Sequence, residues 1–179
     1  MREIVLPETK PALEWINGRV VQKVSPQRKH ALAQAVFAGA LMDWARAGGY
    51  GDVGTEWEFR VAPPGEDRRP LVPDVAFLSF DRLPYEDEDA ADIPCVSPTV
   101  AIEIISPGDR RSDIDEKIRV YIAAGTSAVV MVDTKRREVD LFDLHGRRGF
   151  EESDTLTHES LPGFAMPVRL LFERPRPKR

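Results

Sequence analysis

The stretch VAIEIISPGDRRSDIDEKIRVYIAAG, residues 100–125, predicts a strand, a tight turn and a helix, and it contains an ionisable side chain inside an apolar run. Alternation along the strand places Glu103 on the face opposite Ile102 and Ile104. A carboxylate enclosed on both sides of a sheet needs a cation or a proton, because an unpaired buried charge is costly. What neutralises Glu103 is therefore the first question that the sequence raises.

The N-terminal half supplies a hairpin, a helix and a strand. Asn17-Gly18 separates two strand-like runs, which is the strongest short signal for a β-hairpin. Residues 25–49 change to a helical period, with Ser25 as the expected N-cap and glycines at the end. VGTEWEFRVA, residues 53–62, alternates cleanly and predicts one uninterrupted strand.

The order of the elements predicts the fold class. Further strands are expected at residues 71–80, 100–105, 128–133 and 139–144, and a second helix ends at Gly125. Strands interspersed with two helices indicate an α/β or α+β fold, a mixed β-sheet flanked by helices with an N-terminal β-hairpin. The length of 179 residues fits a single domain over residues 1–179, with frayed termini expected at 1–10 and 174–179.

Composition limits the class of protein. The chain has no apolar run near the ~20 residues that cross a bilayer, and its first residues do not resemble a signal peptide, so we expect a cytoplasmic protein without membrane partners. Its single cysteine, Cys95, argues against a disulfide or a structural zinc site. The formal net charge of −5 argues against a wholly basic nucleic-acid-binding surface, although residues 81–92 hold much of the acid.

Asp74 repeats the oddity of Glu103, since it also lies among apolar strand residues, in LVPDVAFL. The two acids are 29 positions apart, which suits neighbouring strands joined by the long acidic loop. Two carboxylates side by side would repel each other unless a hard cation with oxygen ligands lay between them. The pair therefore predicts a site for Mg²⁺ or Mn²⁺.

Lys117 is the candidate partner on the following helix. Its spacing from Ile114 and Tyr121 puts it at the border of the buried stripe, from where the ammonium could extend to the two acids. The local alternative is an ion pair between Asp113 and Lys117 at i, i+4, and spacing alone favours this second interpretation.

In these motifs the sequence resembles the Uma-two family of restriction endonucleases, part of the PD-(D/E)XK nuclease superfamily. The resemblance rests on PDVAFL, VAIEIISPGDRRSD, KIRVYIAAG and VVMVD, with LEWINGRVV and LPGFAMPVRLLF at the two ends. It implies a restriction-endonuclease-like fold in which Asp74, Glu103 and Lys117 are catalytic. Asp74, Glu103 and the backbone carbonyl of Ile104 would be the metal ligands, and Ile105 stands where the superfamily usually has its lysine.

The resemblance also assigns weaker roles to residues outside this set. Glu56 matches an acid of the second strand region and is a candidate metal ligand, but a solvent-facing glutamate paired with Arg60 is an equal alternative. His30 matches a helical histidine, although a surface or structurally satisfied histidine is favoured. The family commonly has two aromatic residues where this chain has Val129-Val130, a difference that concerns packing more than catalysis.

The implied activity is metal-assisted hydrolysis of phosphodiester bonds in DNA, leaving a 5′-phosphate and a 3′-hydroxyl. Arg110, Arg111 and Arg119 are candidates for contacts with backbone phosphates, with a solvated, arginine-rich helix start as the alternative. A catalytically idle nuclease fold that binds nucleic acid or a protein partner is the competing hypothesis. Homodimerisation would suit double-strand cleavage, which needs two active sites.

Overall fold

The computed structural model describes residues 2–174. Its helices are α1 (Arg28–Gly48), α2 (Glu88–Asp92), α3 (Arg111–Ala123) and the 3₁₀ turn η1 (Val168–Leu171). Its strands are β1 (Leu13–Ile16), β2 (Arg19–Gln22), β3 (Gly51–Thr55), β4 (Phe59–Val61), β5 (Arg69–Leu71), β6 (Val75–Ser79), β7 (Val100–Ile104), β8 (Ala128–Asp133), β9 (Glu138–Asp143), β10 (Gly146–Phe150), β11 (Thr155–Leu156) and β12 (Met166–Pro167).

A six-stranded mixed sheet forms the centre of the molecule, in the order β10-β9-β8-β7-β6-β3. Within the described residues, β7 and β8 are its one parallel pair, and the other neighbours are antiparallel. A parallel pair needs a crossover, and α3 supplies it between these two strands. The predicted mixed sheet with flanking helices and an N-terminal hairpin is thus confirmed.

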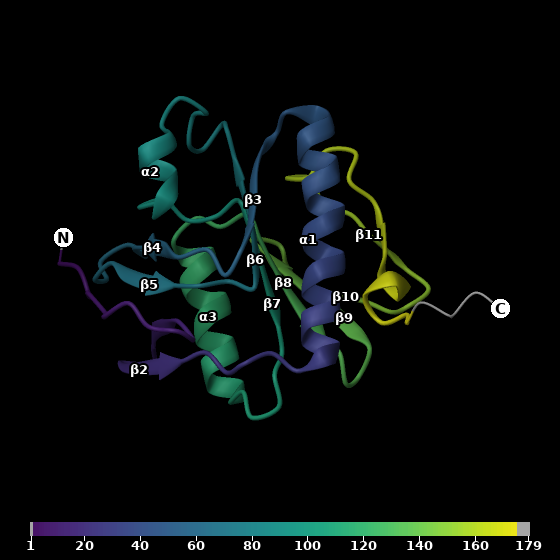
Figure 1. The fold of residues 1–179 in the computed structure, drawn as a ribbon, viewed down its shortest axis with the longest axis horizontal. Helices are drawn as coiled ribbons and strands as arrows, with labels where there is room; N and C mark the ends of the chain where they lie inside the picture. Colours follow the sequence, from purple (N-terminus) through teal and green to yellow (C-terminus); the bar gives the residue numbers. More distant parts are fainter. Residues whose placement is uncertain (1, 175–179) are drawn as a thin grey trace.

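Helices α1 and α3 cover opposite faces of the sheet, as Figure 1 shows. Ile102 and Ile104 pack in the cluster that includes Phe37 and Leu41 of α1. Ala101 packs instead with Tyr121 of α3. The alternation predicted for residues 100–105 is therefore correct, and it puts Glu103 on the α3 side, where it is 6% exposed.

The single strand expected at residues 53–62 is wrong. Glu56 has a φ of +53°, a left-handed conformation that is uncommon for a residue with a side chain, and the backbone turns there. The strand is consequently divided into β3 and β4, which pair with different partners. The alternating pattern was real, but periodicity does not reveal a backbone reversal in its middle.

Other element boundaries differ in detail. Helix α1 begins at Arg28, and its N-cap position is held by Gln27, not by the expected Ser25. Strand β10 extends the sheet beyond β9, where no strand was predicted. The turn between residues 133 and 138 and its β8–β9 hairpin are as expected.

The start of the described chain is tied to the domain. Ile4 N donates to Arg68 O at 2.8 Å, and Arg68 N donates to Arg2 O at 3.0 Å. Residues 2–4 are thus hydrogen-bonded to the segment at Arg68, and the expectation of frayed ends stays a prediction. The same expectation for residues 1 and 175–179 lies outside the described residues. Over residues 2–174, none of the helices has the length and apolar character needed to cross a bilayer.

Candidate active site

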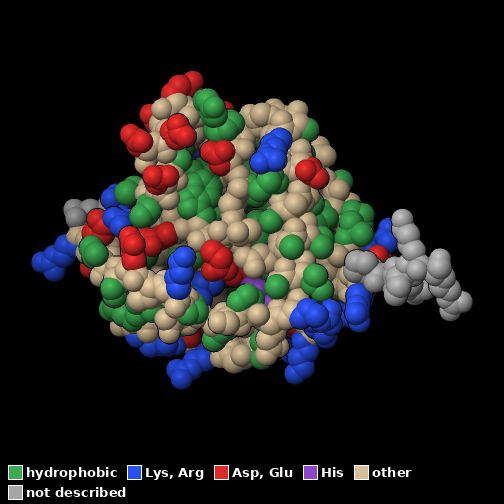
Figure 2. All heavy atoms as spheres, viewed as in Figure 1, with side chains coloured by type: hydrophobic (Ala, Val, Ile, Leu, Met, Phe, Trp, Pro, Cys, Tyr) green, Lys and Arg blue, Asp and Glu red, His purple; other side chains and the backbone are tan. Residues whose placement is uncertain are grey.

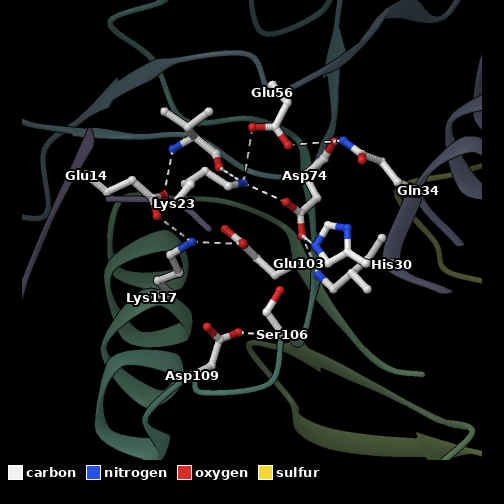
Figure 3. Close-up of polar contacts among 12 residues, drawn as sticks. Glu14, Lys23, His30, Gln34, Glu56, Asp74, Glu103, Ser106, Asp109 and Lys117 are labelled. Atoms are coloured by element: carbon white, nitrogen blue, oxygen red, sulfur yellow. Dashed lines mark hydrogen bonds and ion pairs between the residues drawn. The ribbon is translucent and has the colours of Figure 1, made fainter. Parts of the chain in front are cut away.

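The strand expected at residues 71–80 is interrupted, so Asp74 lies just before β6, and the sheet register brings it beside Glu103 of β7. Val75 of β6 pairs with Ile102 of β7, so the same antiparallel register puts Asp74 opposite Glu103. The contact is fixed by a hydrogen bond from the backbone N–H of Ile104 to Asp74 Oδ2 at 2.6 Å. Figure 3 shows the two side chains side by side, at the end of the sheet where α1 and α3 begin.

Asp74 is almost fully buried, and cations surround it. Lys23 Nζ lies 2.6 Å from Asp74 Oδ1, and His30 Nε2 lies 3.2 Å from Asp74 Oδ2. Burial by itself would raise the pKa of the Asp74 carboxyl, but the hydrogen bond from His30 and the charge of Lys23 hold that pKa well below its usual range. Asp74 is therefore a carboxylate at neutral pH.

Glu103 is held by two groups of α3. Lys117 Nζ lies 2.9 Å from Glu103 Oε2, and the Tyr121 hydroxyl donates to Glu103 Oε1 at 3.2 Å. Burial raises the pKa of Glu103 to about 7, although the charges of Lys117 and Lys23 act to lower it. Of the two strand acids, Glu103 is thus the one that accepts a proton more readily.

Lys117 reaches the acids, and the local pair favoured by spacing is wrong. Its ammonium lies 2.9 Å from both Glu103 Oε2 and Glu14 Oε2. Asp113 instead pairs with Arg19 of the hairpin at 2.5 Å and accepts a hydrogen bond from Asn17. Asp113 is thus paired with the hairpin, and the Lys117 side chain extends toward the sheet instead of toward Asp113.

The hairpin contributes two residues that reasoning from the sequence left out of the site. Glu14 Oε1 accepts a hydrogen bond from Val72 N at 2.9 Å while its other oxygen binds Lys117. Lys23, just beyond β2, supplies the cation beside Asp74. Lys23 follows Val21 by two positions, and this alternation could have indicated that it faces inward. Glu14 lies between the apolar residues Leu13 and Trp15, which suggests a solvent-facing side chain. Glu14 is nevertheless only 2% exposed.

Glu56 and His30 both belong to the site. The backbone turn at Glu56 brings its N–H to the carbonyl of Asp74 at 3.3 Å, and its carboxylate lies 3.6 Å from Lys23 Nζ. Gln34 of α1 donates to both Glu56 Oε1 and the Asp74 carbonyl. Glu56 thus does not pair with Arg60, which instead binds Glu3 and Glu58.

His30 is buried against Asp74 and is not a surface residue. Burial disfavours its charged form, yet the hydrogen bond to Asp74 raises its pKa above the ordinary value. Its other ring nitrogen, Nδ1, is buried without a hydrogen-bond partner in the described part of the chain. His30 therefore contacts Asp74 through Nε2, while Nδ1 stays unpaired in the described part of the chain.

The remaining residues predicted for the site are Ile104 and three arginines of the α3 region. The N–H of Ile104, rather than the carbonyl proposed as a metal ligand, makes the contact with Asp74. Arg110 and Arg111 are exposed at the start of α3. Arg111 pairs with Asp115 at 2.9 Å, but both side chains are more than half exposed. Arg119 is bound by two acids, Glu66 at 2.6 Å and Glu116 at 2.8 Å, and is the least available of the three for a phosphate.

The donor atoms at the site fit a magnesium-like cation. Within residues 2–174, no three His, Cys, Asp or Glu side chains form a complete ligand set. Mg²⁺, however, is usually held by one or two carboxylates and completes its coordination with water and phosphate oxygens. Asp74 Oδ1 and the oxygens of Glu103 each have one accepted hydrogen bond or ion pair and retain a second acceptor position.

The structure thus brings together Asp74, Glu103 at the end of β7, and Lys117 of the next helix. The family model "Putative restriction endonuclease" (Uma2) matches residues 4–169, and the chain belongs to this family. The predicted resemblance to the Uma-two family is thereby confirmed.

A solved structure shows the same fold. The crystal structure titled as "a putative nuclease belonging to DUF820" from Anabaena variabilis ATCC 29413 has a TM-score of 0.82 with this chain. The two sequences are 24% identical, and the match covers 93% of each chain. A comparison with curated proteins finds no match.

Proposed function

We propose that this chain is a metal-dependent endonuclease that hydrolyses phosphodiester bonds in DNA, with Asp74, Glu103 and Lys117 as its catalytic residues. The observation that carries the proposal is that the three side chains meet. Asp74 accepts a hydrogen bond from the backbone N–H of Ile104, next to Glu103, and Glu103 forms an ion pair with Lys117. Membership of the Uma2 family supports the same reaction class. Ion pairs that serve stability alone do not require four acids around two lysines.

Asp74 and Glu103 would hold a Mg²⁺ or Mn²⁺ ion, with the Ile104 carbonyl and Glu56 as further candidate ligands. Such an ion, when bound, polarises a phosphoryl oxygen and acidifies a water molecule. A cavity of about 70 Å³, lined by Glu103, Lys117 and Asp109 among others, offers room for a few water molecules beside Glu103. These features support hydrolysis rather than transfer to another acceptor.

Lys117 would orient the attacking water or stabilise developing negative charge on the phosphoryl group. An ammonium has three N–H donors, and the two acids Glu14 and Glu103 use two of them. The third is left for water or substrate. Tyr121 keeps Glu103 in its position by donating to the carboxylate oxygen that Lys117 does not bind.

The charge distribution supports a DNA substrate at this end of the sheet. Figure 2 shows basic side chains gathered around the start of α1, and the acidic side chains of α2 at the opposite end of the same face. Arg28 and Lys29 are exposed at the start of α1, as Arg110 and Arg111 are at the start of α3. We propose that these side chains bind backbone phosphates on the two sides of the acids.

Cleavage of supercoiled plasmid tests the proposal. The wild-type chain is expected to nick or linearise DNA in Mg²⁺ or Mn²⁺ and to leave 5′-phosphate ends, which end-labelling detects. Asp74→Asn and Glu103→Gln are expected to abolish cleavage, while Asp52→Asn, a matched change at an exposed acid of β3, retains it. Absence of cleavage of DNA and RNA, together with absence of metal binding, would instead favour the idle nuclease fold.

A further inference from the structure

The Lys23 ammonium occupies a position that is surrounded by oxygen atoms. It donates to Asp74 Oδ1 at 2.6 Å and to the Val72 carbonyl at 2.8 Å, and Glu56 Oε2 lies 3.6 Å away. The side chain is 11% exposed, so water contributes little to its solvation. Two carboxylates and a carbonyl are also the kind of ligands that hard divalent cations take. Lys23 therefore stands where a cation would be bound.

Asp74 has acceptor positions for few further partners. Its Oδ2 receives the Ile104 N–H at 2.6 Å and faces His30 Nε2 at 3.2 Å. Each carboxylate oxygen has two lone pairs, so these two partners occupy Oδ2. Oδ1 has one lone pair left beside Lys23. Asp74 therefore cannot bridge two metal ions through its two oxygens, because only Oδ1 is open to one.

The charged groups at the site agree with the single acceptor position left on Asp74. Among the described residues, the contacts join the carboxylates of Glu14, Glu56, Asp74 and Glu103 to the ammonium groups of Lys23 and Lys117. The four carboxylates outnumber the two ammonium groups, so carboxylate oxygens remain for a cation in addition to Lys23 and Lys117.

We propose that the site takes one divalent cation, and that the Lys23 ammonium replaces a second metal ion by neutralising Asp74 from the hairpin side. The inference rests on the proposed function, because it assumes that Asp74 and Glu103 bind a metal. It assigns Lys23 as a positioning residue that holds Asp74 Oδ1, rather than as a group that contacts the scissile phosphate. The hairpin β1–β2 and the residues after it thus become part of the metal site.

Titration of the full-length chain with Mn²⁺ tests the proposal, with stoichiometry measured by calorimetry and by electron paramagnetic resonance. The wild type is expected to bind one Mn²⁺ per chain. Lys23→Ala is expected to bind two, with the spin coupling of neighbouring ions, because its oxygen-lined position is opened. Lys135→Ala, which removes an exposed lysine in the turn between β8 and β9, is the matched control and is expected to bind one.

The outcomes separate this inference from the proposed function. Two ions in the wild type, or one ion in a folded Lys23→Ala variant, would overturn the role of Lys23 while leaving a metal-dependent nuclease intact. No bound ion in the wild type would overturn both. Circular dichroism checks folding, and if Lys23→Ala does not fold, Lys23→Gln, which keeps a side chain of similar length, takes its place. Adding Glu56→Gln to either variant is expected to restore a stoichiometry of one.

Discussion

Two ion-pair networks contact α3, and they differ in burial and in charge balance. On one face of the helix, Lys117 binds acids that are at most 7% exposed. On another face, Arg119 and Arg69 form a ring with Glu66 and Glu116, in which the Arg119 side chain is 47% exposed and the two charges of each sign cancel. The first network carries an excess of acid and the second does not.

The difference in burial and charge balance agrees with the function proposed for the first network. A balanced, partly exposed ring contributes little to stability and has no charge left to attract a ligand. A buried network with unbalanced acids is expensive to maintain, since each uncompensated carboxylate has lost its hydration. Such a cost, paired with a raised pKa at Glu103, is typical of sites that bind a cation.

The largest effect is expected from Lys117→Met. This change leaves Glu14 and Glu103 without their shared cation, and it should lower the free energy of unfolding by about 3–5 kcal/mol at pH 8. At pH 5.5 the loss should be smaller. Glu103 has a pKa of about 7 in the fold and is protonated below it, so the loss of the Lys117 charge is felt by Glu103 as the pH rises above that value.

Urea unfolding at the two pH values measures this effect, and Lys29→Met serves as the control for loss of a lysine. Equal destabilisation of Lys117→Met at pH 5.5 and pH 8 would contradict the assignment of a buried, titrating Glu103.

A smaller effect is expected from Glu14→Gln. The amide can still accept the Val72 N–H, but it no longer offers a carboxylate to Lys117. Loss of such a supporting contact typically costs about 10–100-fold in activity at metal sites. Single-turnover nicking of plasmid should show the loss in the rate at saturating DNA rather than in the affinity for DNA. An unchanged rate would mean that Glu14 serves folding alone.

The balanced ring should respond weakly. Arg119→Ala is expected to cost about 0–1 kcal/mol of stability and to leave the salt dependence of DNA binding unchanged.

The double change Arg110→Ala, Arg111→Ala is expected to reduce the slope of log K against log[salt] by about 2, because each phosphate contact contributes about 0.9. Fluorescence anisotropy at several salt concentrations measures both slopes, and a reduced slope for Arg119→Ala would reverse this assignment.

The smallest effect concerns the link between the hairpin and α3. Burial opposes the charge of Asp113, but its hydrogen bonds to Asn17 and Arg19 lower its pKa below 3.8. A lowered carboxyl pKa adds stability that is present above pH 4 and is lost as the pH falls below it. Asp113→Asn should therefore be less stable than the wild type by under about 1 kcal/mol at pH 7. The two thermal midpoints should approach each other as the pH falls below 3.8, and a constant gap would argue against a charge effect.

Much of the fold follows from local patterns. The alternation around Glu103, the Asn17-Gly18 turn and the helical stripe of α3 each depend on residues close in sequence, and each is found where it was expected. The interruption of the strand at Glu56 was not expected. An alternating run of apolar and polar residues does not indicate which residue has a positive φ. Periodicity indicates which face of a strand a side chain occupies, but it does not indicate where the backbone bends.

The sequence by itself determined that Asp74 and Glu103 are enclosed by apolar strand residues, since burial of one strand face follows from composition and period. Only the tertiary structure decided what neutralises them. Lys23 reaches Asp74 across 51 residues of sequence, and Lys117 reaches Glu14 through the docking of the hairpin on α3. Such contacts depend on sheet register and helix packing, which bring distant residues within 3 Å without leaving a pattern in either segment.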